Sequence, residues 1–221
     1  MPDRTDARIR SLLTLSTCNV SDALDHLRIE GAPRGILPLW PGCPKIAGRA
    51  MTMKLVPGSE GSPVEGTLRA IAEAGTGDVL VIDHGGRTDV NSFGGIAAFS
   101  ALRRGLVGVI IDGVTRDVDE MRPMGFAAYG RGVHQQSIRR RCAFGGHGIE
   151  VTIGGVRVAK GDYLLADENG IVVIPAGSVD AAIRHARGKL EGEERIRAAI
   201  AAGADPLEAH RAGRYEGHRV P

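Results

Sequence analysis

The sequence contains few cysteines, and their spacing gives them no obvious structural role. Cys18, Cys43 and Cys142 are the three cysteines in 221 residues, so they cannot all pair, and none belongs to a CxxC arrangement. The sequence therefore implies neither a disulfide framework nor a zinc site. A reduced, cytoplasmic setting is the location that we expect from this cysteine usage.

Long apolar runs are absent as well. No run approaches the roughly 20 residues that an α-helix needs to span a bilayer. The first residues, MPDRTDARIRSLL, contain no apolar stretch of signal-peptide length. We therefore expect neither membrane insertion nor secretion.

The chain also lacks a concentration of charge of one sign. It has 28 Lys and Arg against 26 Asp and Glu, a formal net charge of +2. Arg139, Arg140 and Arg141 form the one short basic run, which is typical of a solvated loop or a subunit contact. Nucleic-acid-binding proteins usually present a concentrated basic face, so we expect no nucleic-acid partner.

The remaining composition is that of an ordinary globular protein with a surplus of glycine. Apolar residues make up 43% and charged residues 24% of the chain, and 32 residues are glycine. Such a surplus indicates tight turns and places where the backbone approaches a ligand closely. We expect a single domain over residues 1–221, with a core at about 19–175 and a C-terminal helix and tail at 178–221.

The middle of the chain gives the clearest structural pattern. Two short apolar runs, at residues 79–82 and 107–111, flank a small-residue segment at 96–102 that has the length of a helix. This order is typical of a strand, helix, strand unit with a buried parallel pair of strands. The predicted fold class is therefore α/β.

Periodicity and turn residues predict the other elements. Helices are expected at 4–15, 21–27, 67–74, 117–124 and 178–202, and strands at 46–56, 150–153, 156–159, 163–166 and 171–174. Ser21 is expected to cap the second helix. Asn169 and Gly170 predict a hairpin turn between the last two strands.

Two loops that follow the central strands are candidates for a binding site. The first, HGGRTDVNSFGG, ends at Gly94 and Gly95, where the next helix should begin. Helix N-termini at the carboxyl edge of a sheet present unpaired N–H groups that bind anions. A double glycine is also an ordinary turn sequence, so both interpretations stay open here.

The second loop, DGVTRDVDEM, carries Arg116 and Asp117. If the strand pair is parallel and right-handed, both loops lie at one edge of the sheet and share a crevice. The arginine offers a fork of donors suited to a carboxylate, and the aspartate offers hard oxygen ligands suited to Mg²⁺ or Mn²⁺. A surface ion pair and a helix cap are the alternative interpretation of this pair.

Four longer motifs resemble the RraA-like family. They are GDVLVIDHGG at 77–86, FGGIAA at 93–98, RGLVGVIIDGVTRDVDEMRPMGFAAYGRG at 104–132 and GDYLLADENGIVVIP at 161–175. This family includes the class II 4-hydroxy-4-methyl-2-oxoglutarate aldolases, also known as oxaloacetate decarboxylases. The resemblance implies a compact layered sandwich with terminal helices, similar to the swivelling phosphohistidine domain, assembled as a homotrimer or homohexamer.

The resemblance also implies roles for particular residues. The backbone groups that would bind the substrate carboxylate are those of Gly94, Gly95, Ile96 and Ala97. Arg116 would bind the substrate, and Asp117 would hold a divalent metal, Mg²⁺ or Mn²⁺. Glu193, with Glu194 as the next match, would reach from the C-terminal helix of a neighbouring subunit to support the metal's waters.

These roles are consistent with the chemistry of 2-oxo acids. Breaking a carbon–carbon bond beside the 2-oxo group leaves electrons on the pyruvate fragment as an enolate, which a chelated cation and Arg116 would stabilise. The alternative is a lysine Schiff base, but Lys45, Lys54, Lys160 and Lys189 lie outside both loops. We therefore predict a metal-dependent lyase that acts on short 2-oxo acids, by retro-aldol cleavage or by oxaloacetate decarboxylation.

Other polar side chains are weaker candidates, because capping, turn and loop roles explain them at least as well. They are His84, His134, His147, Asp83, Asp89, Asn19 and Asp22. Many relatives have tryptophan at the position of Phe93 and proline at the position of His134. These departures bear on substrate identity more than on reaction type.

Two rival functions accompany the lyase prediction. The founding name of the family belongs to a non-catalytic inhibitor of an RNA-degrading endonuclease, which acts by protein binding. A methyltransferase is a label sometimes attached to such sequences. The chain shows no glycine-rich nucleoside loop with an acidic ribose partner, which disfavours the methyltransferase.

Overall fold

The computed structural model describes residues 6–213, and their fold is mixed α/β, as predicted. The strands are β1 (Leu37–Pro38), β2 (Ile46–Pro57), β3 (Val79–Asn91), β4 (Gly108–Thr115), β5 (Ala127–Gly130), β6 (Gly132–Val133), β7 (Cys142–His147), β8 (Val151–Ile153), β9 (Val156–Val158), β10 (Tyr163–Asp167) and β11 (Gly170–Ile174). The helices are α1 (Ala7–Leu13), α2 (Thr17–His26), α3 (Pro63–Glu73), α4 (Gly95–Arg104), α5 (Val118–Met121), α6 (Val179–Ala201) and α7 (Pro206–Ala212), with a 3-10 turn, η1 (Ala176–Ser178), before α6.

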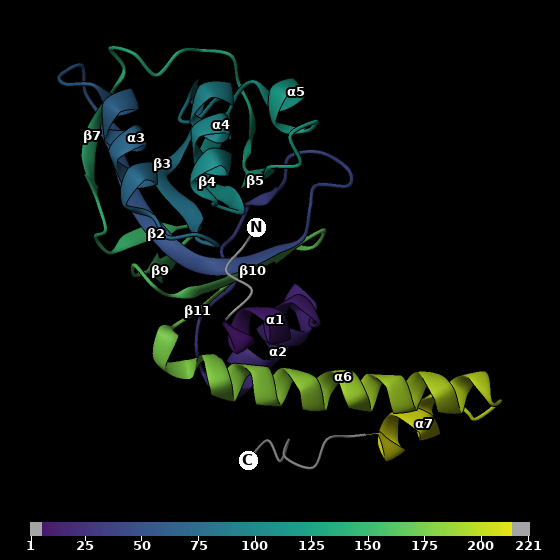
Figure 1. The fold of residues 1–221 in the computed structure, drawn as a ribbon. Coiled ribbons are helices and arrows are strands. Elements are labelled where there is room, and N and C mark those ends of the chain that lie inside the picture. Colours follow the sequence, from purple (N-terminus) through teal and green to yellow (C-terminus); the bar gives the residue numbers. More distant parts are fainter. Residues whose placement is uncertain (1–5, 214–221) are drawn as a thin grey trace.

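The main sheet follows the order β1-β5-β4-β3-β2-β10-β11, with β6 beside β4 and β7 beside β2 (Figure 1). The predicted parallel pair is confirmed, because β3 and β4 run parallel with α4 as the crossover between them. β2 extends this parallel set on one side and β5 on the other. Residues 79–82 and 108–115 are fully buried, which explains why both segments are continuous apolar runs.

Two hydrophobic clusters attach helices to the sheet. One lies where β2 to β5 meet α3 and α4, and it includes Met53, Leu80, Ile110, Ala98 and Ala70. The other lies where β10 and β11 meet α1, α2 and α6, and it includes Leu12, Leu24, Leu165, Val172 and Ile183. Figure 1 shows α3 and α4 on one side of the sheet and the terminal helices on the other.

Several predicted boundaries are wrong. Helix α2 begins at Thr17 rather than at 21, because Ser16 and Asn19 form a capping box, and Ser21 lies inside the helix. The helix expected at 117–124 is α5, which ends at Met121, two residues before Pro123. Arg122 still has helical φ and ψ, but Pro123 has no backbone N–H to continue the helical hydrogen bonds.

Other predicted elements are longer than expected, and five were missed. β3 continues from the predicted 79–82 through Gly85 and Gly86, both at positive φ, to Asn91. The strands β1, β5, β6 and β7 were not predicted, and α7 lies in the expected polar tail, where Asp205 caps it and Pro206 occupies its first turn. Residues 4 and 5 of the first predicted helix and 214–221 of the tail lie outside the described residues.

The predicted hairpin between β10 and β11 is confirmed. Asp167 pairs with Gly170, so the two connecting residues are Glu168 and Asn169, one position earlier than the predicted turn. Gly170 adopts a φ of 130°, which few residues other than glycine tolerate. No helix within residues 6–213 is long and apolar enough to cross a membrane.

Asp167 ties this hairpin to the start of α2. Its buried carboxylate accepts hydrogen bonds from the Thr17 N–H at 2.8 Å, the Thr17 hydroxyl at 2.7 Å and the Asn169 N–H at 2.9 Å. Burial opposes ionisation of this group, but the hydrogen bonds outweigh it and lower the pKa of Asp167. The carboxylate therefore stabilises the fold above its unfolded pKa, and this contribution is lost as the pH falls through the lowered folded value.

Replacing Asp167 by alanine should lower the free energy of unfolding by about 2 kcal/mol at pH 7, because charged hydrogen bonds are lost and buried donors keep no acceptor. Urea denaturation measures this loss. The matched control is Glu168→Ala at the neighbouring loop position, which should change stability by less than about 0.5 kcal/mol. The difference in free energy of unfolding between wild type and Asp167→Ala should shrink below about pH 4. Equal losses of stability in Asp167→Ala and Glu168→Ala would contradict the assignment.

Candidate functional site

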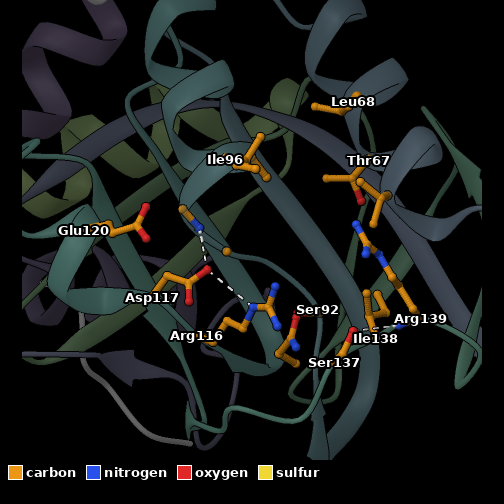
Figure 2. A pocket seen from close by; sticks show the side chains of 15 residues that line it. Thr67, Leu68, Ser92, Ile96, Arg116, Asp117, Glu120, Ser137, Ile138 and Arg139 are labelled. Carbon is orange, nitrogen blue, oxygen red and sulfur yellow. Dashed lines mark hydrogen bonds and ion pairs between the residues drawn. The ribbon is translucent and has the colours of Figure 1, made fainter.

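A pocket of about 230 Å³ opens where the segments after β3 and β4 meet (Figure 2). Its walls come from α3, the end of β3, the first turn of α4, the segment from Arg116 to α5, and the loop before β7. The residues predicted for substrate and metal binding that line it are Gly94, Gly95, Ile96, Ala97, Arg116 and Asp117. The two predicted loops therefore share one crevice, while the roles of these residues stay predictions.

Backbone hydrogen bonds fix the two loops against each other. The Ser92 N–H donates to the Val114 carbonyl at 2.9 Å, and the Arg116 N–H donates to the Phe93 carbonyl at 3.1 Å. The buried Thr115 hydroxyl donates to the same Phe93 carbonyl at 2.8 Å. Because these bonds continue from the parallel strands, the start of α4 and the Arg116–Asp117 pair have a defined relative position.

Asp117 adopts an unusual backbone conformation to reach α4. Its φ of 59° and ψ of 36° lie in the left-handed region, which aspartate tolerates better than most residues. Its Oδ2 accepts a hydrogen bond from the Gly95 N–H at 3.0 Å, whereas its side chain makes no capping bond to α5. The alternative interpretation, in which Asp117 caps the helix that follows it, is therefore not what the structure shows.

The double glycine is explained by close packing. Gly94 has an extended φ of −162°, so no left-handed conformation demands glycine there. A Cβ atom at Gly94 would lie 2.7 Å from Asp117 Oδ2, and one at Gly95 would collide with the Glu120 carboxylate. The absence of a side chain at both glycines allows the Asp117 and Glu120 carboxylates to approach the start of α4. Glycines that served only to reverse the chain direction would not need this space.

The first turn of α4 retains hydrogen-bonding capacity. The initial N–H groups of a helix have no intrahelical acceptor. The N–H of Gly95 donates instead to the Asp117 carboxylate. The N–H groups of Ile96 and Ala97, the next two positions, lie at the wall of the pocket. The partial positive charge of the helix N-terminus favours an anionic ligand at this point.

Arg116 adds an unsatisfied donor beside this helix terminus. Its Nε lies 3.4 Å from Asp117 Oδ2, an ion-pair contact. That nitrogen is buried and has no hydrogen-bond partner within residues 6–213. The Arg116 side chain as a whole is 42% exposed and lines the pocket, so its guanidinium can also meet an anionic ligand there.

Two further charged residues line the pocket and were missed as site candidates. Glu120 stands three residues after Asp117, a spacing that places both on one side of a helical turn and would have been a usable signal. Arg139 belongs to the basic run expected in a solvated loop or subunit contact, yet it lines the wall opposite Arg116 and Asp117 (Figure 2). Nothing in its local sequence indicates this position.

The three histidines weighed as weaker candidates lie outside the lining. His84 is buried, its Nε2 is 3.0 Å from the Val90 carbonyl, and burial lowers its pKa. His134 accepts a hydrogen bond from the Gln136 N–H at 3.0 Å. His147 lies 2.9 Å from a carboxylate oxygen of Glu73.

The acidic and amide candidates are likewise engaged elsewhere. Asp83 pairs with Lys54 at 3.2 Å, and Asp89 pairs with Arg87 at 2.8 Å. Asn19 belongs to the capping box of α2.

Two residues on the terminal helices are also remote from the pocket. Asp22 lies 4.0 Å from Lys189 of α6. Glu193 pairs with Arg197 on α6, and Figure 1 shows α6 on the opposite side of the molecule from α4.

The oxygen donors of the pocket suit a hard divalent cation that shares its coordination with water and substrate. No group of three or more His, Cys, Asp or Glu side chains in the described part of the chain could hold a metal alone. Mg²⁺ commonly binds through one or two carboxylates and completes its shell with water and substrate oxygens. Asp117 meets Gly95 and Arg116 through Oδ2, which leaves Oδ1, together with the Glu120 carboxylate, for such an ion.

Comparison with known proteins relates the chain to one family. A family model described as RraA-like, Aldolase/RraA, matches residues 17–173. The protein DlpA of Legionella pneumophila is 30% identical over 209 residues, which are 94% of this chain and 34% of that protein, so the chain spans about a third of this relative. A Halalkalibacterium halodurans protein that carries the provisional name 4-hydroxy-4-methyl-2-oxoglutarate aldolase is 28% identical over 202 residues, covering 91% of this chain and 92% of that one.

Solved structures show the same fold. An uncharacterized protein from Pseudomonas syringae has a TM-score of 0.84 and 30% identity, covering 95% of this chain and 98% of that chain. RraAS2 of Streptomyces coelicolor, described as an unusual member of the RNase ES inhibitor RraA protein family, has a TM-score of 0.80 and 26% identity, covering 89% and 98%. The likeness to the swivelling phosphohistidine domain stays a prediction.

Replacing Gly94 by alanine should rotate the Asp117 carboxylate away from α4, because the added Cβ would lie 2.7 Å from Oδ2. Loss of its bond to the Gly95 N–H should lower the free energy of unfolding by about 1 kcal/mol. Urea denaturation measures the change. Gly177→Ala is the control, since a Cβ there meets no atom within 4 Å; a Gly94→Ala protein as stable as that control would show that the contact contributes nothing.

Proposed function

The chain belongs to the RraA-like family, and from this premise we propose that it is a divalent-metal-dependent lyase that cleaves a carbon–carbon bond of short 2-oxo acids. The observation that carries the proposal is the meeting of a helix N-terminus, a partly exposed arginine and a carboxylate in one small pocket. The aldolase name of the Halalkalibacterium halodurans relative supports the reaction class.

The pyruvate end of the substrate would bind at the first turn of α4. Its carboxylate would accept hydrogen bonds from the Ile96 and Ala97 N–H groups and from the Arg116 guanidinium. Asp117, held in place by the Gly95 N–H, would hold Mg²⁺ or Mn²⁺. This cation would supply positive charge beside the 2-oxo oxygen, where negative charge grows as the bond breaks.

The protein's own groups would direct the electrons and the proton. Arg116 places a second positive charge beside the oxygen of the forming enolate. Asp117 and Glu120 are the carboxylates among the described lining residues. With Asp117 assigned to the cation, Glu120 would accept the proton of the 4-hydroxyl group as a retro-aldol substrate is cleaved. Oxaloacetate decarboxylation would leave the same enolate and release carbon dioxide instead.

Assembly into a homotrimer or homohexamer is part of the same proposal. Ile96 and Phe99 of α4 are 80% and 56% exposed, and Val64 and Leu68 of α3 are also exposed. Clustered exposed apolar side chains beside a pocket favour coverage by another subunit. Glu193 of a neighbouring copy would then support the waters of the cation. The location that we propose for the protein is the cytoplasm.

A second candidate function is regulation of an RNA-degrading endonuclease by protein binding. The description of the Streptomyces coelicolor structure, which names the RNase ES inhibitor family, favours it. A regulator needs no cation and releases no pyruvate. Pyruvate release from oxaloacetate with Mg²⁺ and with chelator, set beside a pull-down of ribonuclease from lysate, separates the two functions.

Replacing Asp117 by alanine should lower kcat/KM for 4-hydroxy-4-methyl-2-oxoglutarate and oxaloacetate by about 10²- to 10³-fold, because charge stabilisation in the transition state is lost. Pyruvate release coupled to lactate dehydrogenase measures the rate. Asp119→Ala, at an exposed neighbouring carboxylate outside the pocket lining, is the matched control and should retain wild-type activity. Full metal-dependent activity of the Asp117→Ala enzyme would refute this assignment.

Removal of divalent ions should abolish pyruvate release, and addition of Mg²⁺ or Mn²⁺ should restore it. Activity measured in chelator, then after adding each ion in excess, tests the requirement. Undiminished turnover in chelator would exclude a metal-dependent mechanism.

A further inference from the structure

We propose that Asn169, in the loop between β10 and β11, is a site of spontaneous deamidation, and that the carboxylate formed there weakens the link between this hairpin and the start of α2. Asn169 does not line the pocket described above, and the inference is independent of the proposed lyase activity. The modification needs only water and the chain's own backbone.

Asn169 differs from the two other asparagines of the chain in its exposure and in the residue that follows it. The others are Asn19 and Asn91, which are 5% and 3% exposed and precede a valine and a serine. Asn169 is exposed and precedes Gly170. Glycine has no side chain to hinder the approach of its nitrogen to the carbonyl carbon of the preceding side chain. Asn169 therefore has the sequence neighbour and the exposure that favour deamidation.

The reaction balances with water as the co-reactant. The Gly170 nitrogen loses its proton and attacks Cγ of Asn169, and a cyclic succinimide forms as the bond from Cγ to the side-chain nitrogen breaks. That nitrogen takes up the proton and leaves as ammonia. Water then opens the ring at either of its carbonyl carbons, which gives aspartate or isoaspartate at position 169.

The Asp167 carboxylate restrains this reaction in the folded chain. Its Oδ1 accepts hydrogen bonds from the Asn169 N–H at 2.9 Å and from the Asn169 side-chain Nδ2 at 3.2 Å. Gly170, which supplies the attacking nitrogen, pairs with Asp167 across the hairpin. The reaction therefore requires this end of the hairpin to open, and loss of the Asp167 carboxylate should make the opening easier.

The loop is accessible to water. Glu168 and Asn169, the two connecting residues, are both exposed. Asn169 and Gly170 also border a cleft of about 290 Å³, whose other walls include Thr17. Exposed loop ends open at a lower free energy than the strands that they connect. Water can therefore reach the succinimide while the rest of the sheet stays folded.

Deamidation would place a second negative charge against Asp167. The amide nitrogen that is lost lies 3.2 Å from Asp167 Oδ1, so a carboxylate oxygen in its place replaces a hydrogen bond by repulsion. Asp167 also holds α2, through the Thr17 N–H at 2.8 Å and the Thr17 hydroxyl at 2.7 Å. A like charge nearby opposes ionisation of Asp167 and so weakens both bonds to Thr17. Isoaspartate would in addition lengthen the backbone of the loop by a methylene group.

Peptide mapping tests the modification site. The full-length protein is incubated at alkaline pH and digested, and each asparagine-containing peptide is analysed by mass spectrometry for conversion of amide to acid and by enzymatic methylation for isoaspartate. Asn169 should convert at least about tenfold faster than Asn19 and Asn91, because those two react only after larger parts of the fold open. Equal rates at the three asparagines would overturn the site. Asp167→Ala should accelerate the conversion of Asn169, and an unchanged rate would overturn the restraint assigned to Asp167.

Hydrogen exchange at the Thr17 N–H tests the consequence for α2. Asn169→Asp introduces the deamidated side chain directly, and Asn169→Ser, the matched control, removes the amide without adding charge. At pH 7 the protection of the Thr17 N–H should fall about tenfold in Asn169→Asp, the effect expected of one neighbouring like charge, and much less in Asn169→Ser. Equal protection in the two variants would overturn the link between deamidation and α2.

Discussion

The parallel pairing of β3 and β4 is the constraint on which the pocket depends. It brings the segments after both strands to one edge of the sheet, where Phe93 and Val114 accept backbone hydrogen bonds from the opposite segment. The bond from the Gly95 N–H to Asp117 then joins the start of α4 to the only left-handed aspartate among the described residues. Small displacements in this pairing would separate the helix terminus from the carboxylate beside it.

The pocket is also where local conformational preferences are overridden. Asp117 occupies a backbone region that costs free energy for residues other than glycine, and Gly95 lies in the first turn of a helix although glycine is a poor helix former. The surrounding structure maintains both features because two carboxylates must approach α4 closely. Deviations of this kind are typical of functional sites, where stability is exchanged for a particular arrangement of charges.

Sequence patterns predicted those features that depend on near neighbours along the chain. Two continuous apolar runs indicated the buried parallel strands, and turn residues indicated the hairpin before β11. The capping of α2 by Ser16 was local too, but the choice between two serines depended on Asn19. Arg139 could not be predicted, because it reaches the pocket through an irregular loop without periodicity, and only the folded sheet brings that loop to α3.

The charges of the pocket connect the cation with the chemistry of the substrate. Four ionised side chains line it, and the two arginines, Arg116 and Arg139, balance the two carboxylates, Asp117 and Glu120. A divalent cation alone would add two positive charges to a partly enclosed space, and a monoanionic substrate would offset one of them. The carboxylate of Glu193 from a neighbouring copy, proposed to support the waters of the cation, would offset the other. Because uncompensated charge in a partly buried site is costly, the cation, an anionic substrate and that neighbouring carboxylate would stabilise one another in the pocket.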